Sequence, residues 1–350
     1  MSAVADQAYL NTRVSMMATR LFAPGFMKTL AGRSLSELGE QFGLVGILED
    51  TIPTRSKSRA VGHALIQTLL TELTILVRPM APAERSLVLL WGRKFALFNL
   101  KALIRGKLYN LDASEIQENL YPLPANLRLP QKTLFRTENV LELLRQLEAG
   151  PYSLIARQAR EVYEQKREPF ALEGTIDQRY LAALAKQTRE FYGVQHRELH
   201  RVVGVYLDQI NLLWLLRFRF AYRLSPSETF YQLVPSLSLL HRDRLLELVN
   251  LDSIDKVLAA LPEPLDGLLA GSVNLVDLQQ RMAAYAATEA ARVLRHGASG
   301  VARALAYLML REMDLQRLFA LTHGRMLKLP EELVAVAVDL AASPCPMPFQ

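Results

Sequence analysis

The chain has 350 residues, of which 50% are hydrophobic and 22% charged, so it can fold into a globular protein with a large core. Its single cysteine, Cys345, excludes an internal disulfide framework and fits a reducing compartment. The net charge of +6 permits an acidic partner, an anionic membrane surface or nucleic acid, but no nucleic-acid-binding motif accompanies it.

No apolar run approaches the length of about 20 residues that crosses a bilayer. The best candidates, residues 210–216 and 304–310, are short and bounded by charges. The N-terminus carries Asp6 and has no apolar core of a signal peptide. We therefore expect a cytosolic chain without a membrane-spanning segment.

Helices dominate the first half of the chain. Residues 8–31 carry apolar side chains three or four apart, which predicts an amphipathic helix broken at Pro24 and Gly25. Residues 58–77 and 82–109 also predict helices, separated by Pro79. The proline-rich residues 121–130 predict a connector, and helices follow near 137–148 and 152–167.

The second half follows the same pattern. No proline occurs between Thr175 and Tyr222, so we expect either one long helix or two stacked end to end, with weak points at Gly193 and Gly204. Residues 261–271 form the next break, and the last residues, 343–350, predict a flexible tail. Strand-like alternation is nearly absent, so the sequence predicts an all-α fold.

One helix–loop–helix pattern occurs three times. The copies start at Asn99, Asn211 and Arg317, so they lie 211 − 99 = 112 and 317 − 211 = 106 residues apart. This spacing predicts three similar helical units, at 1–120, 121–235 and 236–342, followed by the tail at 343–350. In each copy two leucines three residues apart predict a buried helix face. They are Leu100 and Leu103, Leu212 and Leu215, and Leu318 and Leu321.

Each copy then starts a new helix after a short loop. Asp112 and Ser225 each stand three residues before a glutamate, which predicts a capping side chain. In the third copy Pro330 begins the helix without an obvious capping side chain.

The basic residues of the three copies admit two interpretations. Cations in the last turns of a helix interact favourably with its dipole, by roughly 0.3–1 kcal/mol each when exposed, so they can serve folding alone. If the copies pack around a pseudo-threefold axis, the cations form a ring that can bind the carboxylates or carbonyls of a partner. They are Arg105 and Lys107, Arg217 and Arg219, and His323 and Arg325.

These features together resemble the C subunit of the V/A-type rotary ATPases, the homologue of the d subunit of eukaryotic vacuolar ATPases. The segment from Tyr9 to Leu21 resembles the start of that family, and the three copies resemble its repeated N-L-x-x-L-x-R-x-K element. Residues 176–184 resemble the segment that leads into its second repeat. The resemblance spans essentially the whole chain.

The resemblance implies a funnel-shaped protein in which three helical-bundle units surround a pseudo-threefold axis. Members of the family lie on the cytoplasmic face of the membrane, as peripheral subunits on the proteolipid ring. They receive the central shaft subunits in a socket and transmit torque between ATP-driven rotation and proton or sodium transport. They are not enzymes themselves, so no cofactor, metal or small-molecule substrate is expected.

A socket for a polar shaft should be lined by cationic and polar side chains. We therefore predict that five of the repeated cations point towards the socket or its rim. They are Arg105, Lys107, Arg217, Arg219 and Arg325.

The copies depart from the family pattern in two places. Family members often carry a carboxylate shortly before the repeated asparagine, as Asp208 and Asp314 do here, but the first copy has Ala96 and Phe98. The third copy has Arg317 in place of the asparagine.

Other candidate sites are weaker. His196 and His200 have a metal-compatible spacing, but no third ligand is evident and Glu198 does not directly follow the first histidine, as a zinc protease requires. Phosphate-binding loops and nucleophile elbows are absent. Residues 55–59 form a basic patch that predicts a solvated loop or a contact with lipid phosphates.

Two alternatives to the rotary-ATPase component stay open at this stage. An independent helical scaffold would also need no active site, but the short period of known solenoids, about 34 to 45 residues, is not visible. An all-α enzyme would need clustered carboxylates or Glu-x-x-His pairs, which the sequence lacks.

Overall fold

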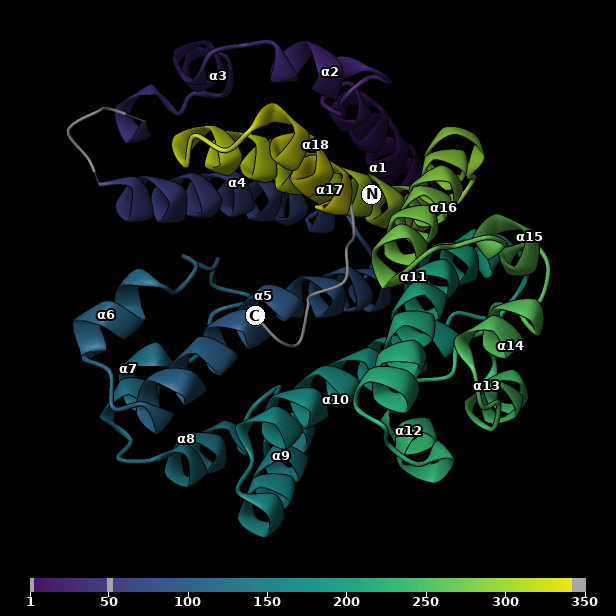
Figure 1. Cartoon of the computed structure of the whole chain (residues 1–350). Helices are drawn as coiled ribbons and strands as arrows, with labels where there is room; N and C mark the ends of the chain where they lie inside the picture. Colours follow the sequence, from purple (N-terminus) through teal and green to yellow (C-terminus); the bar gives the residue numbers. More distant parts are fainter. Residues whose placement is uncertain (1–2, 49–52, 342–350) are drawn as a thin grey trace.

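The computed structural model describes residues 3–48 and 53–341, so the predicted tail at 343–350 and Cys345 lie outside the described residues. Every regular element in the described ranges is helical, which confirms the all-α prediction (Figure 1). The helices of the first half are α1 (Ala3–Ala18), α2 (Phe26–Ala31), α3 (Leu35–Phe42), η1 (Val45–Ile47), α4 (Thr54–Val77), α5 (Pro82–Leu108), α6 (Ala113–Glu118), α7 (Gln131–Arg136), α8 (Val140–Leu147) and α9 (Ser153–Lys166). Those of the second half are α10 (Pro169–Arg189), η2 (Val194–His196), α11 (Arg197–Leu216), the π-helix η3 (Arg217–Ala221), α12 (Pro226–Gln232), α13 (Arg242–Val249), α14 (Ile254–Ala259), α15 (Leu265–Leu269), α16 (Leu275–His296), α17 (Gly300–Met326) and α18 (Glu331–Leu340).

The proline-free stretch predicted as one or two helices forms two, α10 and α11. The break falls at Gly193, whose φ of 98° lies in the left-handed region that favours glycine. Gly204, the other predicted weak point, lies inside α11 instead, where a Cβ atom would stand 2.5 Å from the Cβ of Ser238. Glycine there allows close packing and does not end the helix.

Six helices form a closed cycle of packing. The long helices α5, α11 and α17 carry the three sequence copies, and each is preceded by a partner helix, α4, α10 or α16. Each partner helix contacts two long helices, so α10 packs on α5 and α11, α16 packs on α11 and α17, and α4 packs on α5 and α17. The predicted leucines of all three copies are buried, which confirms the predicted apolar face of each long helix.

The first helices of the chain pack on the last long helix. Figure 1 shows α1 beside α17, at opposite ends of the sequence. The Phe22 N–H donates to Asp314 Oδ2 at 2.8 Å, and Arg303 donates to Asn11 Oδ1 at 2.7 Å and to Ser15 Oγ at 2.8 Å. The N-terminal segment therefore contributes to the structure around the third sequence copy.

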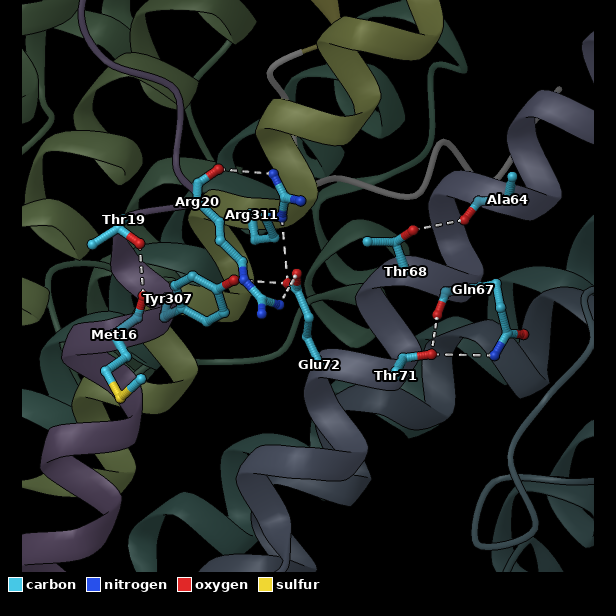
Figure 2. Close-up of polar contacts among 10 residues, drawn as sticks. All are labelled: Met16, Thr19, Arg20, Ala64, Gln67, Thr68, Thr71, Glu72, Tyr307 and Arg311. Atoms are coloured by element: carbon cyan, nitrogen blue, oxygen red, sulfur yellow. Dashed lines mark hydrogen bonds and ion pairs between the residues drawn. The ribbon is translucent and has the colours of Figure 1, made fainter. Parts of the chain in front are cut away.

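A buried carboxylate strengthens this junction. Glu72 of α4 accepts hydrogen bonds from Tyr307 Oη at 2.7 Å and from Arg20 at 3.1 Å, and pairs with Arg311 at 3.3 Å (Figure 2). Arg311 also donates to the Arg20 carbonyl at 3.0 Å. The cluster joins α4, α17 and the turn after α1, which are far apart in the sequence.

α4 is long and apolar enough to cross a membrane by length and composition, and 44% of its most apolar window is buried. The short uninterrupted apolar runs of the sequence do not reveal it. In the structure α4 packs on α17 and α5, and its Glu72 belongs to the buried cluster. These contacts are those of a core helix.

The loop after each long helix has the same geometry. Asn110, Arg223 and Lys328 have φ values of 52°, 57° and 54°, and each ends its helix in the left-handed conformation. The leucine that follows donates its N–H back to the preceding helix in all three loops, at 2.8–3.0 Å, to Gly106 of α5, Phe218 of η3 and Gly324 of α17. The predicted cap at Ser225 is confirmed by a full capping box, whereas the Asp112 side chain makes no capping hydrogen bond.

Candidate partner interface

The first basic residue of each copy contacts the next partner helix in the cycle. Arg105 Nε lies 3.1 Å from Glu173 Oε1 of α10, and Arg217 donates to Gln279 Oε1 of α16 at 3.3 Å. In the third copy His323 Nδ1 lies 2.8 Å from Ser58 Oγ of α4. Each contacted residue is the fifth of its helix, because α10, α16 and α4 begin at residues 169, 275 and 54.

The second basic residue of each copy binds carbonyls at the end of a short helix. Lys107 Nζ donates to the Phe135 carbonyl at 2.9 Å, at the end of α7. Arg219 Nε donates to the Val249 carbonyl at 2.7 Å, at the end of α13, and Arg325 donates to the Ala31 carbonyl at the end of α2. The last carbonyls of a helix have no partner within it, so a cation satisfies them well.

The five predicted interface cations therefore lie at the ends of α5 and α17 and in η3, directly after α11, and each contacts a different neighbouring element. All are partly buried, and each contacts groups of its own chain. These contacts explain the cations as ties between neighbouring helices. Direct contact with a partner stays a prediction for these residues.

A buried ion pair marks the place where two of the long helices meet. Lys94 of α5 and Glu312 of α17 form a salt bridge, and Lys94 Nζ lies 3.9 Å from the centroid of the Trp91 ring. Burial lowers the pKa of Lys94 and raises that of Glu312, while each charge opposes the shift of the other. Lys94 stands five positions before Asn99, and Glu312 stands five positions before Arg317. An alignment of the sequence copies would therefore have shown a lysine and a glutamate at the same position.

Tyr206 of α11 occupies the same register, five positions before Asn211, and its side chain is buried. A small pocket lies beside it, between α11, α16 and α17. Its walls are almost wholly apolar, with Glu289 as the charged member. The lining residues are Val202, Val205, Tyr206, Ala286, Glu289, Ala290, Met309 and Met313.

Exposed cations lie on the first turns of α11 and the last turns of α16, and two of them contact Glu289 of this pocket. Glu289 Oε2 lies 3.2 Å from Arg201 Nε, and its Oε1 accepts a hydrogen bond from Arg292 at 3.4 Å. Glu198 joins the first turn of α11 to the link between α16 and α17, because it accepts the N–H groups of Ala298 and Ser299 at 3.0–3.1 Å. We call this surface the basic face, made of Arg197, Arg201, Arg292, Arg295 and His296, all of which are exposed.

The histidine pair at the start of α11 has a structural role. His200 Nε2 lies 2.5 Å from the Phe191 carbonyl and 3.1 Å from the Thr188 carbonyl, at the end of α10. The His196 ring packs edge-on against Phe191. In residues 3–48 and 53–341 no three metal-binding side chains come together.

The basic patch at residues 55–59 is not the predicted loop. It forms the first turns of α4, where Arg59 pairs with Glu118 and Arg55 Nη2 lies 3.9 Å from Glu115 Oε1 of α6. No capping side chain marks this helix start in the sequence, so the predicted start at residue 58 falls four residues too late.

Comparison with known proteins decides the family. A profile of the ATP synthase (C/AC39) subunit family matches residues 10–335. The chain belongs to this family, as the sequence copies and the opening segment predicted. The match covers all three long helices, and so includes every contact described above.

Several relatives are named as the C subunits of A-type ATP synthases. The one from Methanocaldococcus jannaschii is 26% identical over an alignment of 356 positions. This alignment covers 96% of this chain and 87% of the relative. Those from Methanosphaera stadtmanae and Methanobrevibacter smithii are 27% and 26% identical over 34% and 40% of this chain, and over 31% and 37% of their own lengths. The chain is thus similar over nearly its whole length to a component of an ATP synthase.

Proposed function

We propose that the chain is a non-catalytic central-stalk component that links the rotor shaft to the membrane ring of a V/A-type ATPase. It transmits torque between ion translocation and ATP synthesis or hydrolysis. It lies on the cytoplasmic face of the membrane as a peripheral protein. Its partners in this role are the central shaft subunits and the proteolipid ring.

The closed cycle of six helices carries this proposal. A torque adapter must be stiff, and close-packed helices resist deformation. Equivalent residues of the three copies contact the fifth residue of the next partner helix, and this pattern returns from α17 to α4. The pattern supports three similar units around a pseudo-threefold axis, in the funnel-like arrangement that the family resemblance implies.

The contacts also suggest how the units are built. In the first two copies Asn99 and Asn211 exchange two hydrogen bonds with the backbone of Tyr121 and Val234. In the third copy the N-terminal segment contacts the long helix instead, through the Phe22 N–H on Asp314 and the Ala31 carbonyl on Arg325. We propose that residues of the predicted first unit, 1–120, complete the third one, 236–342.

In this proposal the five cations Arg105, Lys107, Arg217, Arg219 and Arg325 hold the rim of the socket together. Co-purification tests the assignment. The wild-type chain should recover both shaft and ring from an assembled complex, and Arg217→Glu with Arg219→Glu should weaken assembly with the shaft, because Arg219 loses its three carbonyl partners.

Lys132→Glu with Arg136→Glu, two exposed cations of α7, is the matched control and should assemble normally. Recovery of neither shaft nor ring by the wild-type chain would instead favour an independent helical scaffold. Unchanged assembly of the Arg217 and Arg219 variant would refute the role given to the rim cations.

A further inference from the structure

The basic face carries more exposed positive charge than helix stability explains. Arg197 is the first residue of α11, where the helix dipole disfavours a cation. Arg295 and His296 end α16, where the dipole favours them. The helix dipole thus explains the cations at the end of α16 but does not explain Arg197 at the start of α11.

Carboxylates near this face are turned inward. Glu289 is 8% exposed and is used by Arg201 and Arg292, while Glu198 is used by backbone N–H groups at the start of α17. Arg197 and Arg295 form no ion pair within residues 3–48 and 53–341. The cations of this surface are therefore exposed to solvent, whereas its two carboxylates are used in contacts within the chain.

A small apolar cavity of about 10 Å³, which has room for about one water molecule, lies next to these cations. Glu289 lines this cavity and also holds Arg201 and Arg292, so the two arginines stand beside it. The cavity is too small to receive a side chain of a partner, so the exposed side chains around it form the docking surface.

The link before α11 adds two exposed apolar side chains. Tyr192 is 81% exposed and Val194 is 69% exposed, five and three positions before Arg197. The corresponding links of the other copies, at 78–81 and 297–299, are shorter than this one at 190–196. Tyrosine and arginine are residue types enriched among the energetically dominant residues of protein interfaces.

We propose that the basic face docks an acidic segment of the central shaft, which sets carboxylates on the arginines and packs one apolar side chain against Tyr192 and Val194. The inference rests on the proposed function and adds the surface that makes the contact. A protein segment fits better than a bilayer, because the exposed apolar side chains of the face, Tyr192 and Val194, are confined to the link before α11. A membrane would need apolar side chains that project all along the face.

The test separates the charges from the apolar contact. Arg197→Glu with Arg295→Glu reverses two exposed charges that have no ion pair to lose within the described residues, and Tyr192→Ala removes a side chain that is 81% exposed. Lys132→Glu with Arg136→Glu is the matched control for net charge. Binding of each purified chain to the isolated shaft subunits and to the detergent-solubilised ring is measured at low and high salt.

We expect the charge variant to bind the shaft at least about tenfold more weakly at low salt, with a smaller salt dependence, since it removes steering and pairing across the interface. Tyr192→Ala should weaken shaft binding at both salt concentrations. Ring binding should stay at the wild-type level for both variants, and the control should match the wild type throughout.

The other outcomes would refute either the proposed function or this inference. Wild-type binding to neither shaft nor ring refutes the proposed function. Wild-type affinity of both variants for the shaft refutes this inference and leaves the proposed function standing, and loss of ring binding alone would place the ring on this face. Sedimentation with vesicles rich in anionic phospholipid, lost in the charge variant while shaft binding persists, would assign the face to the membrane instead.

Discussion

At the scale of single residues, the third copy depends on a buried acid. Asp208 and Asp314 stand three positions before Asn211 and Arg317, and both accept backbone N–H groups from the segment packed against their helix. Burial raises the pKa of Asp314 to about 6, although the Phe22 N–H and nearby arginines oppose the shift. The family resemblance drew attention to both acids, but the sequence could not show that Asp314 binds a segment 292 residues away.

This shift predicts a pH effect. Because the pKa of Asp314 is higher in the folded chain than in the unfolded one, the folded chain binds more protons between the two values. The stability of the wild type relative to Asp314→Asn should therefore fall as the pH rises from about 4 to 6, by up to about 3 kcal/mol, and stay level above that range. Urea unfolding of both chains across this range measures the difference, and a constant difference would contradict the shift.

Glu72 allows a second residue-scale prediction. Glu72→Ala should destabilise the fold by about 3–5 kcal/mol, because it leaves Arg311 and Tyr307 without their buried acceptor. Denaturant unfolding measures the loss. Glu247→Ala, which removes an exposed pair with Arg244, is the control and should change stability by no more than about 1 kcal/mol.

At the scale of elements, the side chain at one position explains the π-helix at the end of α11. In the other copies Gly106 and Gly324 lie against Ile116 and Val334, so close that an added Cβ atom would stand under 3.0 Å from those side chains. Phe218 occupies the matching place in the second copy. Its bulk excludes the same close approach of α12, and the wider turn of η3 accommodates it.

Close packing at the glycine predicts a sensitive position. Gly106→Ala should destabilise the fold by about 1–3 kcal/mol through overpacking against Ile116, and the added change Ile116→Val should recover part of the loss. Thermal unfolding of the single and double variants measures both effects. Gly150→Ala meets no atom within 4 Å and should leave stability nearly unchanged.

The elements themselves were largely predictable from the sequence. Periodicity and proline placed α4 and α5 within four residues of their observed ends, and the repeated leucines indicated the buried faces. The roles of the repeated cations were harder to predict, because a cation that binds the end of a helix and a cation that binds a partner produce the same sequence pattern. Their contacts with α10, α16 and α4 could be found only from the folded chain.

At the scale of the whole molecule, the chain itself connects α5 to α10 and α11 to α16. The cycle closes between α17 and α4, where only non-covalent contacts join the two helices. Between α17 and the helices α1 to α4 stand the Glu72 cluster and the Phe22–Asp314 bond. The Lys94–Glu312 ion pair joins α17 to α5 nearby. No local sequence signal predicts such contacts, because their members are more than 200 residues apart.

The ion pair at this junction predicts a non-additive response. Glu312→Leu should cost about 3–5 kcal/mol, because Lys94 is then buried without its carboxylate. Lys94→Met combined with Glu312→Leu should cost less than the two single changes together, since neither charge is left unpaired. A double-mutant cycle from unfolding curves measures the coupling, and strictly additive losses would contradict it.

The packing of α1 to α3 on α17 also orders events during synthesis. The ribosome delivers the opening helices first and their main support almost last, so the nascent chain holds Leu10, Val14 and Met17 without a finished core for most of its translation. A message truncated before the start of α17 would yield a product that cannot bury these side chains, and the cell's proteases could cleave its exposed opening helices.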